Sequence, residues 1–550
     1  MIMKSVNSLS KKLIAAIVAG AILLTLPMAG CNNPFDSGKD NEGSKSSDSS
    51  GSSKKTSGAS EENLNGKTVM KTAHYSIPFN VFEYFYNAHY QEFANTYGSV
   101  IDASKPLDEQ YYDSEHKTSW KEYFIETAKD NFIQIMLFAE SALKDGMTLT
   151  DEDKKTLDQA FAQLEEMAAQ NGQTADEYFK SMYGDNITRE DVRKIQEMST
   201  LGMKYREKVQ KGCKFTDEEY EAEFQKDKTA NEIADYYTYT FGFAKPDDDG
   251  TSMIVDEKAK KEMKEHAEAL ANSKNAKEFN DYLTKFLQKN PSMVPISADD
   301  EKAQSSLTEA EFTSALNSYV ESCAHLKEAY SDSSDLKKWI FDESRKTGDT
   351  KVQETETGYD VVLIEKPIYR DETSTRNVRH ILITADSLVS AGEATDTASV
   401  KDEQVKAYAQ KIYDEWTAKD TTEEHFAELA NTYSTDPGSN TNGGLYENVT
   451  QGTMVPSFND WMFDKARKQG DSGIVKTDYG YHIMYYVGTG LKVWQVSIHS
   501  TLVSEKVKAA FEEMKKTIPI EYDRDLMNKV NITIKEEASE EESSAANLAN

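Results

Sequence analysis

This 550-residue chain contains an internal repeat. The segment from Asp335, DLKKWIFDESRKTGDTKVQETETGYDVVLIEK, aligns without a gap with the segment from Ser457, SFNDWMFDKARKQGDSGIVKTDYGYHIMYYVG. Trp, Phe, Asp, Arg, Gly and the pair Gly-Tyr recur at the same places in both segments. Each segment begins with a helical pattern and ends with a strand-like apolar run. A chain that carries such a unit twice is predicted to fold into two homologous modules.

Matching strands extend both copies upstream. YYTYTFGFAK, residues 236–245, corresponds to NVRHILITAD, residues 377–386. The repeat therefore predicts modules over residues 231–370 and 371–490, each built as strand, helices, strand. The chain is long enough for further domains beside these two.

The beginning of the chain reads as a targeting segment. Residues 13–26 form an apolar run that is too short to span a bilayer, and lysines precede it, so residues 1–30 are predicted to be a signal peptide. The sequence Met-Ala-Gly-Cys that ends at Cys31 resembles a bacterial lipobox, which implies attachment of a lipid to Cys31. The alternative is an ordinary cleaved signal followed by a chance cysteine.

Two polar segments flank the part of the chain that can fold. Residues 31–62 are rich in Ser, Gly, Lys and Asp and have almost no apolar residues, so a flexible tether is predicted. Residues 537–550 are predicted to be a disordered acidic tail. With the lipobox, this layout predicts a protein that is exported and held on the outer face of the cell membrane.

Residues 63–230 carry a helical pattern. Apolar residues recur at steps of three and four at Trp120, Phe124, Ala128, Phe132, Ile135, Ala139 and Ala142. Threonines that precede a carboxylate by three positions predict helix starts at Thr150, Thr188 and Thr216. A last amphipathic helix within residues 500–536 presents Val503, Val507, Phe511 and Met514 on one face. A lone helix of this length is marginal, so we expect it to complete the N-terminal helical domain.

Aromatic residues crowd the start of this helical domain, at Tyr75, Phe79, Phe82, Tyr84, Phe85, Tyr86, Tyr90, Phe93 and Tyr97. One interpretation is an adhesive surface for unfolded chains. Most of these residues are expected instead to pack the helices together, because large aromatic side chains dominate protein cores.

Charge and cysteine spacing exclude several classes of function. The chain has 63 Lys and Arg against 95 Asp and Glu, a net charge of −32, which argues against nucleic acid as a partner. Cys213 and Cys323 lie far apart and belong to no cluster of Cys and His, so no metal site is expected. No motif suggests a cofactor.

The second module resembles parvulin-type peptidyl-prolyl isomerases. Four pieces match in the family's order: VRHILI from Val378, FAELANTYSTDPGSNTNGG from Phe426, QGTMVPSFNDWMF from Gln451, and GYHIMYY from Gly480. The wider layout of lipobox, helical domain, parvulin modules and returning helix resembles the PrsA-type foldase lipoproteins, whose periplasmic relatives are the SurA-type chaperones. The fold class expected is therefore α+β and multidomain: a helical chaperone domain and two parvulin-like domains, each a small antiparallel sheet with surrounding helices.

The resemblance implies a set of site residues. The two histidines that parvulins place on neighbouring central strands fall on His380 and His482, and Asp436 stands where the family has Asp or Cys near the target amide. Met454 and Phe458 occupy the positions of the proline pocket. Isomerisation breaks no bond, so neither a nucleophile nor a metal is needed. We therefore expect the histidines to organise the site rather than to carry protons.

The second module departs from the family pattern at two places. Tyr479, which is expected at the substrate-binding rim, stands where the family has a small residue beside the second His. After Gly443 and Gly444, the usual Asp-Leu-Gly-aromatic run is replaced by Leu-Tyr-Glu-Asn at residues 445–448. Either change could reshape the rim of the pocket.

The first module lacks the site residues. Thr240 is expected at the position of the first His, and Asp360 replaces the second. Residues 231–370 are therefore predicted to be a degenerate, non-catalytic parvulin-like domain that serves as scaffold or as a surface for clients.

Two functions from different classes follow. The leading hypothesis is a membrane-anchored isomerase and chaperone for exported proteins with Xaa-Pro bonds. The alternative is a holdase in which both parvulin modules are inactive. The sequence leaves the oligomeric state open, with a homodimer as one option.

Overall fold

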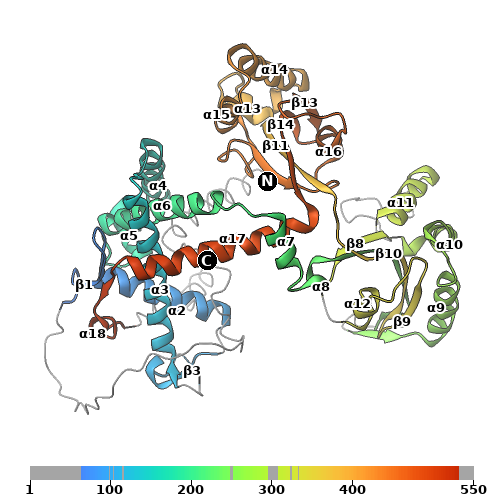
Figure 1. Ribbon diagram of the computed structural model, residues 1–550, viewed down its shortest axis with the longest axis horizontal. Coiled ribbons are helices and arrows are strands. Elements are labelled where there is room, and N and C mark those ends of the chain that lie inside the picture. The colour runs from blue at the N-terminus through green and yellow to red at the C-terminus, as the bar shows by residue number, and fades with distance from the viewer. Residues whose placement is uncertain are drawn as a thin grey trace, which may run out of the picture. The chain divides into compact units, whose positions relative to one another are not determined.

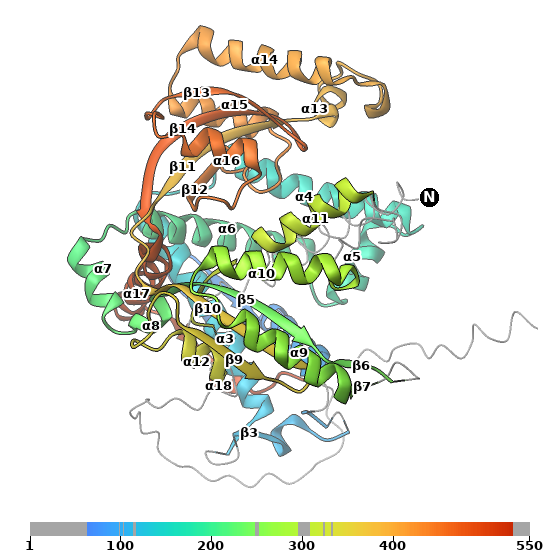
Figure 2. The ribbon, with the colours of Figure 1, turned by 90° about the vertical axis from the view of Figure 1, so that its right-hand side faces the viewer.

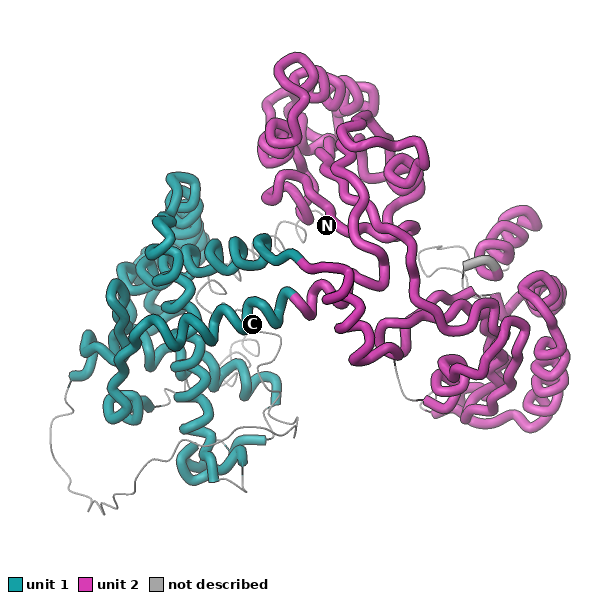
Figure 3. Tube along the Cα trace, in the orientation of Figure 1, with its two compact units in different colours: residues 1–214, 503–550 teal, residues 215–502 magenta. Residues whose placement is uncertain are grey.

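The computed structural model describes residues 63–97, 100–102, 104–113, 117–247, 252–294, 308–322, 325–331 and 334–531. The predicted signal peptide, Cys31, the tether and the acidic tail lie outside the described residues. The chain divides into two compact units, residues 1–214 with 503–550 and residues 215–502 (Figure 3). No helix in the described ranges combines the length and apolarity that crossing a membrane requires.

The first unit is mainly helical (Figure 1). Its helices are α2 (Phe79–Tyr97), α3 (Trp120–Lys144), α4 (Asp151–Gln170), α5 (Ala175–Tyr183), α6 (Arg189–Lys211), the last part of α17 (Val493–Thr517), and α18 (Arg524–Met527), with the 3₁₀ turn η1 (Leu107–Glu109). Its strands are β1 (Thr68–Lys71), β2 (Ser76–Pro78), β3 (Tyr111–Asp113), β4 (Thr118–Ser119) and β15 (Glu521–Tyr522).

The predicted helix starts are confirmed. Thr150, Thr188 and Thr216 are N-caps of α4, α6 and α7 (Asp217–Phe224), and each forms a complete capping box with the carboxylate three residues later. The threonine hydroxyl accepts the N–H of that residue while its carboxylate accepts the N–H of the threonine, which satisfies two of the free donors at a helix start.

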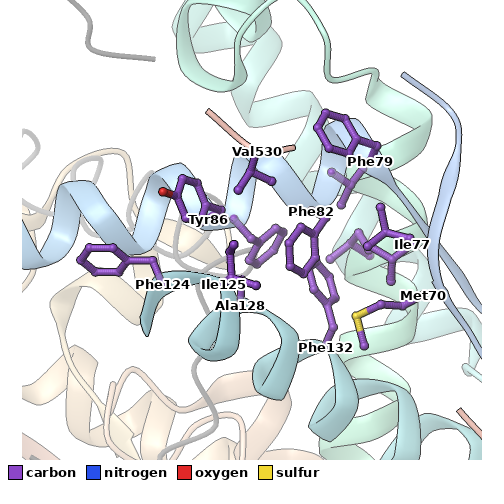
Figure 4. Close-up of a cluster of buried hydrophobic side chains, with 14 of the residues drawn as sticks. Met70, Ile77, Phe79, Phe82, Tyr86, Phe124, Ile125, Ala128, Phe132 and Val530 are labelled. Atoms are coloured by element: carbon purple, nitrogen blue, oxygen red, sulfur yellow. The ribbon is translucent and has the colours of Figure 1, made fainter. Parts of the chain in front are cut away.

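The aromatic residues at the start of the first unit mostly build its core (Figure 4). Phe82, Tyr86, Phe124 and Phe132 from α2 and α3 are fully buried, and the rings of Phe85 and Phe132 meet edge-on at 4.7 Å. The expectation that these rings pack helices is confirmed for the buried members of the group, listed here: Phe79, Phe82, Phe85, Tyr86, Tyr90 and Phe93.

The C-terminal segment returns to this core. In α17, Val507, Phe511 and Met514 pack against Leu137 and Phe138 of α3. Strand β15 then adds to the edge of β1, and Val530 lies among the buried side chains of the cluster in Figure 4. The first unit is thus closed by residues more than 300 positions away in the sequence.

The second unit contains two four-stranded sheets and the short two-stranded sheet β6-β7. After α7 and α8 (Lys228–Asn231) come β5 (Ile233–Gly242), β6 (Ala244–Pro246), β7 (Met253–Val255), α9 (Glu257–Leu270), α10 (Ala276–Lys289), η2 (Pro291–Met293), α11 (Glu309–Ser322), β8 (His325–Ala329), α12 (Asp335–Ile340), β9 (Thr350–Glu354) and β10 (Gly358–Tyr369). Then follow β11 (Ser374–Ile383), α13 (Ala385–Ser390), η4 (Thr397–Ser399), α14 (Asp402–Lys419), α15 (Glu423–Tyr433), β12 (Leu445–Val449), α16 (Pro456–Phe463), β13 (Ser472–Thr477) and β14 (Gly480–Lys492).

The two four-stranded sheets have the same topology. Their strand orders are β8-β5-β10-β9 and β12-β11-β14-β13, and every pairing is antiparallel. In the second sheet, α14 and α15 pack on one face and α16 on the other (Figure 2). In the first sheet, α9 and α10 cover one face and α12 the other. The sequence repeat therefore corresponds to two modules with the same fold.

The glycine of the repeated Gly-Tyr pair has the same packing role in both modules. A Cβ on Gly480 would lie 2.5 Å from the carbonyl oxygen of Ile383, and a Cβ on Gly358 would lie 2.9 Å from that of Phe241. Gly480 also has a φ of 142°, which side chains rarely adopt. The central strands approach each other too closely at this point for any side chain.

The repeated Trp and Arg form a second shared device. The guanidinium of Arg467 lies 3.8 Å from the ring centre of Trp461, and that of Arg345 lies 4.8 Å from the ring centre of Trp339. Such contacts stabilise a loop against its helix by cation–π attraction. These repeated residues therefore hold the module together rather than form a site.

Candidate functional site

The two predicted site histidines meet inside the second sheet. His380 lies on β11 opposite Met484, and His482 lies on β14 opposite Leu382, so both side chains share the face that α16 covers. Their Nδ1 atoms are 3.0 Å apart, and the residues are 2% and 5% exposed. Diagonal positions on adjacent strands bring long side chains into contact in this way. The two histidines form one buried, hydrogen-bonded pair.

Asp436 joins this pair from the loop after α15. Its Oδ2 lies 3.2 Å from Nε2 of His380. The loop is held by Leu382 of β11, which donates its N–H to the Ser434 hydroxyl at 3.1 Å and accepts the N–H of Thr435 at 3.0 Å. The backbone of the central strand thus fixes where the carboxylate enters the site.

Two further residues bind the same carboxylate oxygen. The hydroxyl of Ser439 donates to Asp436 Oδ2 at 2.5 Å, and the hydroxyl of Tyr446 donates at 3.0 Å. The ring of Tyr446 also stacks on His380, with centroids 5.2 Å apart. Sequence reasoning did not assign either residue to the site. Tyr446 belongs to the segment that departs from the family, and that departure was the available signal.

Thr477 ends the network on the other side. Its hydroxyl lies 2.9 Å from Nε2 of His482 and accepts the backbone N–H of Tyr479 at 3.1 Å. Thr477 was also missed, because the repeat places Thr355 at the same position in the module without histidines. There, the hydroxyl of Thr355 accepts the N–H of Gly358 within its turn, at 3.0 Å. A residue that serves the turn in both copies serves the site in one.

One arrangement of protons satisfies every member of the network. Thr477 donates to Nε2 of His482, Nδ1–H of His482 donates to Nδ1 of His380, and Nε2–H of His380 donates to Asp436. Each of the four ring nitrogens then has a hydrogen-bond partner, and the carboxylate accepts from His380. Because buried polar groups are costly when unpaired, this fully paired chain fixes both ring orientations.

The electrostatics fix the charge of three members of the site. Burial, with the neighbouring His380 as the second cause, lowers the pKa of His482 to about 4. The hydrogen bond from His380 holds the pKa of Asp436 well below its usual range, and Ser439 adds to this effect. Burial next to Asp436 raises the pKa of Tyr446 to about 12. At neutral pH, His482 is therefore neutral, Asp436 ionised and Tyr446 a donor.

The predicted pocket residues lie against the histidines. Phe458, on α16, is 3% exposed and meets both rings edge-on, at 5.4 Å from His380 and 5.3 Å from His482. Met454, in the turn before α16, packs half-buried on the apolar cluster that contains Phe458. An apolar wall and a polar network thus share one face of the sheet.

Tyr479 has a different place. It lies in the turn between β13 and β14 and is 67% exposed. Its backbone takes part in the network through Thr477, while its ring stands at the surface. The structure therefore brings together His380, Asp436, His482 and Phe458 directly, and Tyr479 through its main chain.

The turn at Gly443 and Gly444 locks the edge of the site. Gly444 has a φ of 71°, and its carbonyl accepts the N–H of His380 at 2.8 Å. A Cβ on Gly444 would lie 2.2 Å from the carbonyl oxygen of His380. Only glycine permits so close an approach, which places the following strand β12 beside His380.

Comparisons with known proteins agree with this geometry. Residues 363–487 match the PPIC-type PPIASE domain family. Foldase protein PrsA 1 of Listeria monocytogenes is 30% identical over 225 residues, which cover 39% of this chain and 68% of that protein. The chain belongs to the PrsA foldase family. It carries a parvulin-type isomerase domain, so the activity and the α+β multidomain fold class predicted from the sequence are confirmed.

Other relatives share parts of the chain. Chaperone SurA of Pseudomonas fluorescens is 36% identical over 119 residues, 22% of this chain and 24% of that protein. The solved structure of peptidylprolyl isomerase (PrsA) from Bacillus anthracis covers 51% of this chain and all of that chain at 14% identity, with a TM-score of 0.18. That structural likeness is too weak to bear on the fold.

The first module of this PrsA-family chain differs at the same positions, with one correction. Thr240 was expected at the position of His380, but the strand pairing places Thr238 there: Thr238 is opposite Val362, as His380 is opposite Met484. Thr240 instead pairs with Asp360 and donates its hydroxyl to that carboxylate at 2.6 Å. The assignment of Thr240 was therefore wrong by two residues, and Thr238 and Thr240 lie on the same face of β5 because side chains alternate along a strand.

Proposed function

We propose that His380, Asp436 and His482 form the catalytic network of the isomerase, with Met454 and Phe458 as its proline pocket and Tyr479 at its rim. The observation that carries this proposal is the 3.0 Å contact between two buried histidines whose other nitrogens both have partners. Histidines with a merely structural role need no carboxylate aimed at them beside an apolar wall. This combination is suited to holding a polar amide next to an apolar ring.

The chemistry requires no bond to be broken. Rotation about an Xaa-Pro bond crosses a barrier of about 20 kcal/mol because amide resonance is lost at the twisted geometry. A site accelerates rotation when it binds the twisted amide better than either planar form. Phe458 and Met454 provide an apolar surface for the proline ring, and this dry surface disfavours the charge separation of the planar amide.

The polar side acts through fixed dipoles. The hydrogen-bond chain from Thr477 to Asp436 keeps both imidazoles oriented, so they need not reorganise as the amide turns. No proton has to move, because the substrate gains and loses none. The histidines are therefore organisers of an electrostatic environment, and Asp436 is the group that sets their tautomers.

An assay on the full chain tests these roles. We expect wild-type protein to accelerate isomerisation of an Xaa-Pro tetrapeptide, and His482→Asn to return the rate close to the spontaneous one. An unchanged rate in His482→Asn would remove the histidine pair from the mechanism. A wild-type rate equal to the spontaneous one would leave the holdase alternative, in which the helical unit protects clients without isomerisation.

We further propose that the protein works outside the cell membrane, held there by a lipid on Cys31, on newly exported and unfolded proteins. Support comes from the lipobox-like sequence before Cys31 and from the foldase and chaperone relatives. In a labelled-palmitate experiment, Cys31→Ala should abolish both lipid incorporation and recovery with the membrane fraction. Label retained in Cys31→Ala would place the lipid elsewhere and refute this anchor.

The helical unit is the proposed chaperone part. Its core is complete only with the returning C-terminal segment, so its activity should depend on both ends of the chain. We expect the full-length His482→Asn variant to suppress aggregation of a reduced client as well as wild type. Loss of suppression in that variant would place chaperone activity in the isomerase domain instead.

A further inference from the structure

Tyr446 lies at the edge of the site, in the segment that departs from the family pattern. It is on β12 opposite Val378, and its ring packs on the apolar cluster that contains Phe458. The same ring stacks on His380, with an angle of 30° between the two planes. One side chain therefore touches both the apolar and the polar half of the site.

The hydroxyl of Tyr446 completes the bonding of Asp436. Oδ2 of Asp436 has three partners: His380 Nε2 at 3.2 Å, Ser439 Oγ at 2.5 Å and Tyr446 Oη at 3.0 Å. A carboxylate group turns easily about its last bond, which has broad torsional wells. Three donors from three segments restrict that rotation and keep the oxygen aimed at His380.

Gly438 makes room for this hydroxyl. A Cβ at Gly438 would lie 2.7 Å from Oη of Tyr446 but 3.7 Å from its Cζ and 3.5 Å from Oδ2 of Asp436. Of these three atoms, the methyl group of an alanine at position 438 would displace only the hydroxyl oxygen of Tyr446. The φ of Gly438 lies outside the left-handed region, so its backbone would accept alanine. Space, rather than backbone conformation, is what the glycine provides.

We propose that Tyr446 is a positioning residue for the isomerisation, whose ring orients the imidazole of His380 and whose hydroxyl, accommodated by Gly438, orients Asp436. This inference rests on the proposed roles of His380 and Asp436. Tyr446 acts through these two groups, so its loss should lower kcat while KM changes little. A residue that only supported the fold would not separate the two constants.

Three variants of the full chain test the proposal: Tyr446→Phe, Gly438→Ala and the double variant. Tyr446→Phe keeps every ring carbon and removes only the hydroxyl, and we expect kcat to fall about tenfold, as for loss of one hydrogen bond to a charged group. Gly438→Ala displaces the hydroxyl and should cause a similar fall. In the double variant the methyl meets no hydroxyl, so its kcat should equal that of Tyr446→Phe alone.

Tyr481→Phe is the matched control. Its hydroxyl donates to Asp402 at 2.7 Å, but the ring lies among the buried residues on the other face of the sheet. This variant loses the same kind of bond in the same module and should keep wild-type kcat. Thermal melting of all four variants checks that each remains folded.

Two results would overturn the proposal. One is a wild-type kcat in Tyr446→Phe, and the other is a double variant whose loss equals the product of the single losses. Both are distinguishable from failure of the proposed site. If His482→Asn is fully active, the site itself is misassigned; if His482→Asn is inactive while Tyr446→Phe is wild-type, only the role of Tyr446 fails.

Discussion

The two four-stranded sheets of the second unit have the same topology and differ in the side chains on their central strands. At corresponding places of the central strands, the second sheet has His380 and His482, and the first has Thr238 and Asp360. Gly358 and Gly480, by contrast, stand against equivalent carbonyl groups in both sheets. The comparison separates residues that are fixed by how strands pack from residues that are free to change once no site depends on them.

The hydrogen-bond network of the site contains a residue that both modules share. Thr355 and Thr477 occupy equivalent positions of the repeat, and the hydroxyl of each binds a backbone N–H of its own turn. Only Thr477 also contacts an imidazole. A residue preserved in both copies is thus not excluded from function. A residue that recurs in both modules has a role in the fold, and in the second module such a residue can also belong to the site.

The largest expected difference concerns activity. His380→Ala removes the centre of the network and should lower kcat/KM for an Xaa-Pro tetrapeptide by about 100- to 1,000-fold, the effect of removing one preorganised donor from an active site. The corresponding change in the first sheet, Thr238→Ala, should leave the rate unchanged. An equal loss in both variants would show that the first module takes part in isomerisation and would break the comparison.

The next expected difference is in acid stability. His482 has a pKa lowered from 6.5 to about 4 in the folded protein, chiefly by burial, so the unfolded chain binds this proton more readily. The stability that depends on neutral His482 is complete above pH 6.5 and is lost as the pH falls toward 4. The second sheet should therefore lose about 3 kcal/mol of unfolding free energy between pH 7 and pH 4.

Amide hydrogen exchange can measure this loss strand by strand. Protection of β11 and β14 should fall with pH more steeply than protection of β5 and β10, after correction for intrinsic exchange. His482→Asn should remove the excess slope. Parallel losses in both sheets, or an unaltered slope in that variant, would show that another group controls acid stability.

A smaller difference is expected from the shared glycines. Gly480→Ala forces a side chain into a left-handed backbone 2.5 Å from a carbonyl oxygen and should destabilise its module by about 2 kcal/mol. Gly358→Ala meets a similar carbonyl at 2.9 Å without the unfavourable φ and should cost roughly half as much. Calorimetry of the full chain would compare the two; a larger effect for Gly358 would contradict the assignment of strain to φ.

The smallest expected effect concerns the cation–π pairs. Arg467→Gln should destabilise the second module by about 1 kcal/mol, and Arg345→Gln should destabilise the first by less. Arg467 lies closer to its Trp and also donates its Nε–H to the carbonyl of Trp461 at 3.0 Å. Calorimetry again provides the measurement, with Lys468→Gln, an exposed neighbour in the same loop, as control. Equal effects of all three changes would show that the cation–π pairs contribute nothing to stability.

The helices and strands, the duplication and the family-related residues could be predicted from the sequence. Threonine caps, the apolar spacing of α3 and the paired motifs depend on local chemistry or on direct likeness, so they could be read from the chain. His380, Asp436, His482, Met454 and Phe458 were assigned in the same way, and the structure places all five around one sheet face.

The strand register and the remaining members of the network could not be predicted from the sequence, because they depend on how distant segments pack. The first module's equivalent of His380 is Thr238 because hydrogen-bond pairing, which sequence spacing does not record, sets which residues are opposite. Ser439, Tyr446 and Thr477 lie 59, 66 and 97 positions after His380, and ordinary hydroxyl residues at such distances give no local signal. Their roles arise when a glycine turn, a short loop and a neighbouring strand bring three hydroxyl groups to two imidazoles and one carboxylate.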